Sequence, residues 1–486
     1  MLKKIEIYLA MGFIAAFFTL SILHIFTGYA DNGDFTRNCE FLFEKPDGFS
    51  LMWPSANTIE WHRRFFSLWH DKWIFLENWP NIDTLPQYTS YPLYLFLQAK
   101  LSSLLTLDSS RYSIILGSLI SRVILFITIV SLLYHMRKHS SLWVFWGFSL
   151  LAALVFLDSN WLAFLNSFYE EQMAIIFLPV IALLFCKYYR TRSVTLGFLL
   201  LITITIVACA KTLYFYFPLL IAPFLYPFCR GKFANVTFLL LIVGCQSIAF
   251  MAVTTGKYQK FNAYNALYFG TLKGLNSEEV KAMSFIGNKP VLPQCVGISP
   301  YSQKGHECLV KANASYEDTL RLLSKHPTLG LKMLSQALAK GQNVNIDYLK
   351  KNRAEGLHFS ELPIFNVLPI IFAQGLNVWM CFLLLVVLVV LMKGKTLALR
   401  VKSPLTIGLF FTCVGLSQYI AVLGDGFYEI NKHLSIANYT FALSGMFILP
   451  VLLELLALRY GSCHKPAHPR KNISEWFSVS LNLSRH

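Results

Sequence analysis

Two aspartates, Asp31 and Asp34, follow the first long apolar run of the chain, together with Gly33 and Arg37. Ionisable side chains are costly to place at a membrane boundary, so a chain that holds them there generally uses them. An anion at the C-terminal end of a helix also opposes the helix dipole, which leaves Asp31 without a simple structural role. We therefore predict that Asp31 and Asp34 are catalytic. The structural alternative for Asp34 is the N-cap of a helix that begins at Phe35, which is worth about 1 kcal/mol.

Three further groups of polar residues stand between apolar runs. They are Asn166 to Glu171, Lys211 with Thr212, Tyr214 and Tyr216, and Asp425 with Glu429, Lys432 and His433. If the apolar runs are membrane spans, all three groups fall on the same side of the membrane as Asp31 and Asp34. Charges gathered at one interface are typical of a site that acts on a substrate there, whereas a transporter places them near the midplane.

Each of these groups has a structural alternative, which the sequence leaves open. Glu170 and Glu171 would favour the N-terminus of a helix through its dipole. The long side chain of Lys211 would reach lipid headgroups, and Lys432 with His433 would anchor a helix at the interface. Asp425 precedes a glycine, which is typical of a turn.

Sugar transfer from a phosphate leaving group fits this set of side chains. One carboxylate must accept the proton of the acceptor hydroxyl, while phosphate leaves well without a strong acid. Cations must offset the charge of the phosphate. We predict that the donor phosphate binds to Lys432, His433, Lys211 and Arg37. We predict that the substrate or a metal contacts Glu170, Glu171, Asp425 and Glu429. A divalent cation is chemically reasonable, but no ligand spacing requires one, so the cofactor stays open.

Composition indicates an all-α, polytopic membrane protein. The 486 residues are 55% hydrophobic and 14% charged, against about 25% charged residues in soluble domains. Apolar runs near the length of a membrane helix recur along the whole chain. The net charge of +16 does not indicate a nucleic-acid partner, because the bases gather in short loops between these runs. Membrane lipids are the partners that the composition implies.

The apolar runs predict about ten membrane spans. They cover roughly residues 8–29, 112–136, 141–157, 172–189, 193–210, 212–228, 234–254, 363–392, 404–423 and 434–457. We divide the chain into an N-terminal membrane module (1–254), a helical loop domain (255–362), C-terminal membrane helices (363–458) and a basic tail (459–486). The first outer loop, 30–110, is rich in tryptophan, which suits short helices lying in the membrane interface.

Several islands of the sequence resemble the GT-C superfamily of membrane glycosyltransferases. They are Asp31 to Phe35, Asn166 to Glu170, Phe269 to Gly274, and Gly424 to Gly426 with Lys432, His433 and Asn438. The set is most similar to bacterial surface-glycan hexosyltransferases. In that family a more polar, proline-bearing motif is expected around Lys211, and the segment from Ala210 to Tyr214 departs from it. The resemblance implies an inverting transfer from a polyprenyl-phosphate sugar to a glycan or lipid-linked acceptor. It also implies Asp34 as the base and an active site on the outer face of a bacterial inner membrane.

Two other functions are compatible with a polytopic membrane protein. A lipid or glycan transporter (a flippase) would show paired polar breaks within the spans of two similar halves, and no internal repeat is visible in the sequence. A lipid-linked glycan ligase or polymerase would favour an outer loop rich in arginine and histidine. The second long loop has His306 and His326 but no arginine cluster.

Cys295 and Cys308 are predicted to form a disulfide, because they lie thirteen positions apart in a loop assigned to the oxidising outer side. Cys39 is then left over among the cysteines of the loops. A bridge over this distance stabilises a folded domain by about 3 kcal/mol.

The basic residues predict that both termini are cytoplasmic and that the long loops 30–110 and 255–362 lie outside. A single cysteine placed by Ser302→Cys should therefore react with a membrane-impermeant maleimide in intact cells. A cysteine placed in the basic tail should react only after the cells are opened. Protection of the Ser302→Cys protein in intact cells would contradict this orientation.

Overall fold

A computed structural model describes most of the chain. The described residues are 12–16, 18–19, 38–44, 72–81, 83, 85, 88–106, 110–225, 232–254, 259–300, 302–342, 344, 371, 375, 379–380, 383–384, 386–389, 399–427 and 430–463. Among the residues singled out above, Asp31, Asp34, Arg37 and Glu429 lie outside them. So do most of the predicted spans 8–29 and 363–392 and the tail beyond residue 463.

The protein is an integral, multi-pass helical membrane protein. Five helices of the described part are long and apolar enough to cross a membrane: Ile114–His139, Glu171–Thr191, Asn235–Thr254, Val401–Asp425 and Ile430–Ala457. A bent pair, Leu142–Phe156 with Asn160–Asn166, would make a sixth span. Val194–Ala208 and Thr212–Leu225 are shorter apolar helices. Eight of the ten predicted spans therefore coincide with apolar helical segments.

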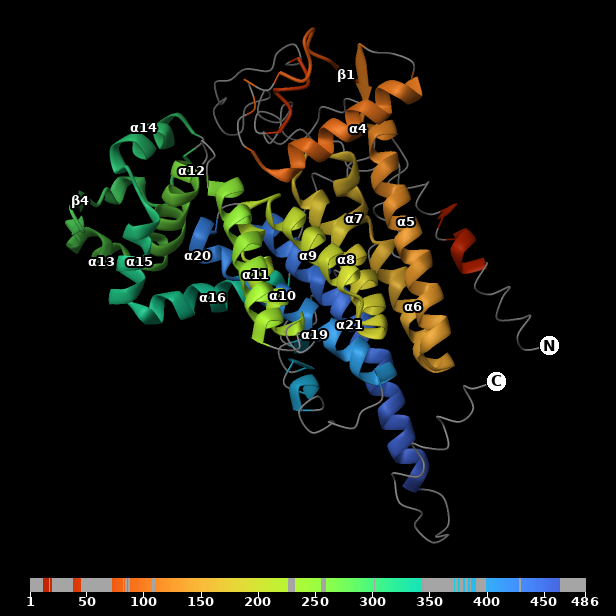
Figure 1. The fold of residues 1–486 in the computed structure, drawn as a ribbon. Helices are drawn as coiled ribbons and strands as arrows, with labels where there is room; N and C mark the ends of the chain where they lie inside the picture. Colours follow the sequence, from red (N-terminus) through yellow and green to blue (C-terminus); the bar gives the residue numbers. More distant parts are fainter. Residues whose placement is uncertain are drawn as a thin grey trace, which may run out of the picture.

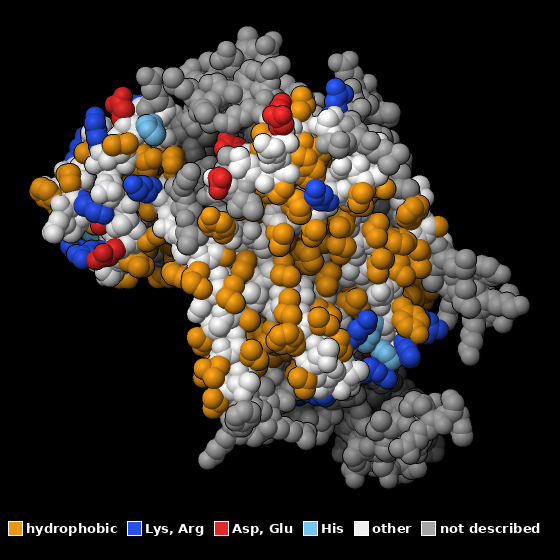
Figure 2. Space-filling view, turned by 45° about the horizontal axis from the view of Figure 1, so that its top comes forward, with side chains coloured by type: hydrophobic (Ala, Val, Ile, Leu, Met, Phe, Trp, Pro, Cys, Tyr) orange, Lys and Arg blue, Asp and Glu red, His pale blue; other side chains and the backbone are white. Residues whose placement is uncertain are grey.

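Side-chain caps and charges explain where several of these helices begin and end. The hydroxyl of Ser113 accepts a bond from the backbone of the first turn of α5 (Ile114–His139), and Ser141 does the same for α6 (Leu142–Phe156). Arg137, Lys138 and His139 occupy the last turn of α5, where cations favour the helix dipole. Figure 2 shows a broad belt of hydrophobic side chains over the helical body, with basic side chains gathered near its lower edge.

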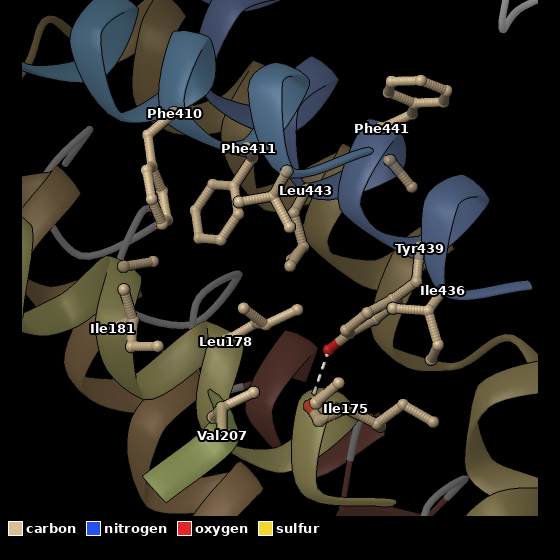
Figure 3. Close-up of a cluster of buried hydrophobic side chains, with 14 of the residues drawn as sticks. Ile175, Leu178, Ile181, Val207, Phe410, Phe411, Ile436, Tyr439, Phe441 and Leu443 are labelled. Carbon is tan, nitrogen blue, oxygen red and sulfur yellow. Dashed lines mark hydrogen bonds between the residues drawn. The ribbon is translucent and has the colours of Figure 1, made fainter. Parts of the chain in front are cut away.

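The membrane helices pack around one core. α8 (Glu171–Thr191), α9 (Val194–Ala208), α19 (Leu399–Gln418) and α21 (Ile430–Cys463) run side by side in the bundle (Figure 1). Figure 3 shows Leu178 of α8 facing Phe411 of α19, and the Tyr439 hydroxyl of α21 donating to the Ile175 carbonyl at 2.9 Å. Lipid is as apolar as these side chains, so dispersion and hydrogen bonds stabilise the bundle more than the hydrophobic effect does.

Small residues let α19 and α21 approach closely. A methyl group at Gly408 would come within 2.4 Å of Ile448, so only glycine fits there. The Ser444 hydroxyl donates to the Gly408 carbonyl at 2.7 Å and lies 2.7 Å from the Thr412 hydroxyl. Close backbones with short hydroxyl side chains are a usual solution where helices associate inside a membrane.

The described part of the first outer loop contains one long helix and one short sheet. The long helix is α4 (Ser90–Thr106). β1 (Lys72–Ile74) pairs antiparallel with β2 (Arg111–Ser113), so residues 72–74 form a strand where short helices were expected. The reason is an aromatic cluster, in which Phe43 stacks on Tyr112 at 4.9 Å and Trp73 meets Phe168 at 5.0 Å. Within the ladder, Trp73 faces Tyr112, and cross-strand aromatic pairs of this kind favour strands.

The second long loop forms the predicted helical domain, seen as a lobe at the left of Figure 1. Its elements are α12 (Gln259–Tyr264), the π-helix η7 (Asn265–Thr271), η8 (Leu272–Gly274), α13 (Ser277–Ala282), β3 (Phe285–Ile286), β4 (Lys289–Pro290), η9 (Pro293–Cys295), α14 (Gln303–Ala312), α15 (Tyr316–Lys325) and α16 (Pro327–Gly341). The predicted disulfide between Cys295 and Cys308 is present and lies in the core of this loop domain.

Two glycines join the loop domain to the membrane helices. Gly426 follows α20 (Ala421–Asp425) and has φ +60° and ψ −145°, a conformation open mainly to glycine. A methyl group on Gly426 would lie 2.5 Å from the Asn265 carbonyl and 2.6 Å from the Gly270 nitrogen. Phe427 donates its N–H to the Phe269 carbonyl at 3.5 Å. Two of the motifs that carry the GT-C resemblance, Phe269 to Gly274 and Gly424 to Gly426, therefore touch through their backbones.

This contact predicts opposite outcomes for two neighbouring glycines. Gly426→Ala should lower the free energy of unfolding by about 1–3 kcal/mol, because alanine is strained at this φ and meets the loop-domain backbone. Gly424→Ala should be neutral or slightly stabilising, because nothing lies within 4 Å and the residue is helical. Thermal melting of the detergent-solubilised protein compares the two. Equal melting temperatures would contradict a tight junction at Gly426.

Candidate functional site

The polar groups singled out in the sequence come together where the described helices meet the loop domain. Glu170 and Glu171 begin α8, and Lys211 lies between α9 and the 3-10 turn η5 (Thr212–Tyr214). Lys432 and His433 belong to the first turn of α21, and Asp425 ends α20. Asp31, Asp34, Arg37 and Glu429 fall outside the described residues, so their predicted roles stay predictions.

Glu171 and Lys211 form a buried ion pair. The Lys211 ammonium donates directly to Glu171 Oε1, and the two side chains are 8% and 1% exposed. The Lys211 side chain therefore does not extend to lipid headgroups. Glu171 lies in the first turn of α8, where the helix dipole favours a carboxylate. The structural alternative that the sequence left open for Glu171 therefore also applies. The pair joins the N-terminal end of α8 to the segment that follows α9 in a medium of low dielectric constant, where opposite charges attract strongly.

Lys432 and Tyr214 lie in the same buried cluster. The Lys432 ammonium is 4.9 Å from the centre of the Tyr169 ring, within the range of a cation–π contact. The Tyr214 hydroxyl is close enough to feel the charges of Glu171, Glu170 and Lys432. Tyr214 is fully buried, and within the described part of the chain its hydroxyl has no hydrogen-bond partner. The cluster thus combines two carboxylates, two ammonium groups and a phenol.

Asp425 and His433 form a second pair, which continues into the loop domain. His433 Nε2 lies 3.1 Å from Asp425 Oδ2, and Asn265 Nδ2 donates to Asp425 Oδ1 at 2.9 Å. Asn265 is the first residue of the π-helix η7. Sequence reasoning did not select Asn265, although the nearby motif Phe269 to Gly274 was a signal on the same segment.

A polar network fixes the segment that carries the two glutamates. Gln172 Nε2 donates to the carbonyls of Phe164 at 3.1 Å and Ser167 at 3.2 Å, and Gln98 of α4 donates to Gln172 Oε1 at 2.6 Å. Buried amides that bond the backbone in this way hold a turn in one conformation. The first outer loop also reaches this segment, because the Asn38 amide donates to the Phe168 carbonyl at 3.2 Å.

The described residues contain no group of three or more His, Cys, Asp or Glu side chains arranged to hold a metal ion. Glu171 is bound by Lys211, and Asp425 is bound by His433 and Asn265. In the described part, these carboxylates therefore pair with an ammonium group, an imidazole and an amide of the protein. A metal that used Asp31, Asp34 or Glu429 would involve residues outside this part.

The Lys211–Glu171 pair predicts that the stability of the folded protein falls sharply when only one of the two partners is removed. Lys211→Met leaves a buried carboxylate without its cation, which should cost about 3–5 kcal/mol of stability. The double variant Lys211→Met/Glu171→Met should lose much less, since no buried charge is left unpaired. Thermal melting of both proteins measures this difference.

Lys311→Met is the matched control, because Lys311 and Glu307 form an exposed pair at 3.7 Å on α14. Pairs of that kind contribute about 0–1 kcal/mol. A double variant that is as unstable as the sum of its single variants would contradict a coupled buried pair.

The chain is similar to a known family of membrane proteins. Residues 1–462 match the family described as "YfdI N-terminal transmembrane domain". The chain is also 24% identical over 383 residues to "Uncharacterized protein YfdI" of Escherichia coli (strain K12), a match over 75% of this chain and 81% of that protein. No solved structure matches the chain. Because the family match runs over nearly the whole chain, the protein belongs to the family of the YfdI N-terminal transmembrane domain.

Proposed function

We propose that the protein is a GT-C-type hexosyltransferase. It moves a sugar from a polyprenyl-phosphate donor to a glycan or lipid-linked acceptor on the outer face of a bacterial inner membrane, with inversion at the anomeric carbon. The observation that carries the proposal is the pair Lys432–His433 in the first turn of a long membrane helix, buried beside carboxylates. The resemblance of the motifs to membrane glycosyltransferases supports the same conclusion.

Lys432 and His433 suit the phosphate of the donor. Cations in the first turn of a helix oppose the helix dipole, so their placement at the start of α21 has a cost that a bound anion offsets. The N-terminal end of a helix also favours a bound anion through its dipole. Both side chains are nearly buried, which strengthens their attraction for an anion. A lipid-linked phosphate would reach them from the side of the bilayer.

Asp34 is the proposed base. The oxygen of the acceptor hydroxyl attacks the anomeric carbon, the bond from that carbon to the phosphate oxygen breaks, and the hydroxyl proton passes to the Asp34 carboxylate. The polyprenyl phosphate leaves with its charge held by Lys432 and His433. The contact of Asn38 with the Phe168 carbonyl supports this role, because it joins the loop that carries Asp34 to the segment before Glu170. Asp31 would orient Asp34 or the acceptor.

Lys211 and Glu171 have a supporting role in this proposal. Because each is bound to the other, neither is available in this structure as a simple phosphate ligand or base. Their pair lies close to Tyr214, which in turn lies close to Lys432. The ion pair therefore helps to keep the outer ends of α8 and α9 in place around the cation that binds phosphate.

The variant Asp34→Asn tests the proposed function. Asparagine keeps the size of the side chain and caps a helix as well as aspartate does, but it cannot accept the proton. We expect sugar transfer to fall by about 10²–10⁴-fold, with normal expression and melting temperature. The measurement is the transfer of radiolabelled sugar from a polyprenyl-phosphate sugar to a membrane acceptor fraction, with purified protein in lipid vesicles.

Asp83→Asn is the control, because Asp83 is an exposed residue of the same outer loop. It should transfer sugar at the rate of the unchanged protein. Transfer by Asp34→Asn at nearly that rate would eliminate Asp34 as the base and leave only its role as a helix cap. Failure of the unchanged protein to transfer from any polyprenyl-phosphate hexose would contradict the proposed function as a whole.

A further inference from the structure

Three side chains form a continuous hydrogen-bonded chain from the loop domain to the first turn of α21. Asn265 Nδ2 donates to Asp425 Oδ1 at 2.9 Å, and Asp425 Oδ2 lies 3.1 Å from His433 Nε2. The three residues come from three different elements, η7, α20 and α21, and Asn265 is 160 residues away from Asp425 in sequence. The chain of bonds therefore exists only when the loop domain is docked.

The carboxylate determines how the imidazole of His433 is used. Because Nε2 lies within hydrogen-bonding distance of Asp425 Oδ2, the ring is held in one orientation, and Nδ1 lies on its other edge. The His433 side chain is 8% exposed, and in the described part of the protein Nδ1 has no hydrogen-bond partner. A buried polar atom without a hydrogen-bond partner destabilises the folded protein by about 1–3 kcal/mol. A ligand that hydrogen-bonds to Nδ1 would remove this destabilisation.

Asn265 determines which oxygen of the Asp425 carboxylate faces His433. Its amide occupies Oδ1 of Asp425, and so the carboxylate keeps Oδ2 for His433. Burial of Tyr316 on α15, followed by the nearby charge of Asp425, raises the pKa of the Tyr316 hydroxyl, which stays protonated beside the carboxylate. The Asn265 amide and the neutral Tyr316 phenol are thus two groups of the described loop domain that leave the negative charge of Asp425 to His433.

The backbone supports the same arrangement. Asn265 opens a π-helix, a form that occurs mostly as short insertions and frequently at functional sites. Within that π-helix, Gly270 touches Gly426, the residue that follows Asp425. Asn265 and Asp425 are therefore held in register by a backbone contact that admits no side chain at Gly426.

We propose that Asn265 and Asp425 are positioning residues, which hold His433 so that an N–H at its Nδ1 atom donates a hydrogen bond to a phosphate oxygen of a polyprenyl-phosphate ligand. The loop domain then forms part of the donor site, although Asn265 itself does not touch the ligand. This inference rests on the proposed function, since it names the group that receives the phosphate. It gives Asp425 a structural partner, His433, in place of the direct contact with substrate or metal that the sequence predicted.

Binding of the leaving group tests the proposal without turnover. The probe is geranylgeranyl monophosphate, and geranylgeraniol is the matched ligand without phosphate. Full-length protein in detergent is titrated with each, and dissociation constants are measured by thermophoresis. His433→Gln should weaken phosphate binding about tenfold, the effect of one lost hydrogen bond to an anion. Asn265→Ala should weaken it several-fold. Binding of the alcohol should not change in either variant.

A double variant separates positioning from direct binding. If Asn265 acts through His433, then Asn265→Ala/His433→Gln should bind the phosphate no more weakly than His433→Gln alone. If the two substitutions weaken phosphate binding additively, Asn265 does not act through His433 and the proposal is wrong. Gln336→Ala and His306→Gln are the controls, because both residues are exposed in the loop domain, and both variants should bind the phosphate as the unchanged protein does. Asn265→Ser, which keeps a short hydrogen-bonding group, replaces Asn265→Ala if the alanine protein does not fold.

The outcomes for the inference and for the proposed function are distinct. If the unchanged protein prefers the phosphate to the alcohol but Asn265→Ala and His433→Gln bind it equally well, the inference is wrong and the proposed function stands. If the unchanged protein binds the two lipids equally, the phosphate site itself is wrong, and with it the assignment of Lys432 and His433. Preference for the phosphate, lost in His433→Gln and not lost further in the double variant, supports both.

Discussion

The buried ion pair between Glu171 and Lys211 is the interaction on which the arrangement of the site depends. Charges inside a membrane protein persist only when they are paired, because the bilayer offers no water to replace a lost partner. Here the pair joins the N-terminal end of α8 to the end of α9, where the apolar run stops and a 3-10 turn begins. The break places Tyr214 beside Glu171, Glu170 and Lys432. One interaction therefore joins α8 to the turn after α9, and Lys432 of α21 packs on Tyr169, just before α8.

Hydrophobicity predicted most of the fold, and the reason is physical. A membrane helix must satisfy its backbone bonds internally, so its length and composition are visible in the sequence without its partners. The helical loop domain, α16 and the disulfide were predictable for similar reasons, from a helical period and from two cysteines in an outer loop. The strand β1 was not, because Trp73 faces Tyr112 on β2 and packs against Phe168, and both partners are distant in sequence.

The candidate site was predictable as a list of residues but not as a set of pairs. Lys211 was grouped with donors for phosphate, yet its partner is Glu171, forty residues earlier. Asp425 was grouped with ligands of substrate or metal, yet it binds His433 and an asparagine 160 residues away. Charge and position at a helix end are properties of one residue, whereas pairing is a property of the packed structure. Single-residue reasoning therefore found the charged members and missed Asn265, which carries no charge.

The loop domain and the membrane helices meet where the cations gather, and this has a consequence for how the site can work. The start of α21 holds Lys432 and His433 against its own dipole, so the unliganded arrangement is stabilised by acidic and aromatic neighbours: Tyr169 beside Lys432, and Asp425 beside His433. Asp425 is held in turn by Asn265 and by the Gly270–Gly426 contact. Displacement of the loop domain would remove the support of His433 while leaving Lys432 on Tyr169. The two cations thus depend on different parts of the protein, Lys432 on the segment before α8 and His433 on the loop domain. A donor phosphate that needs both would bind only when both parts are in place.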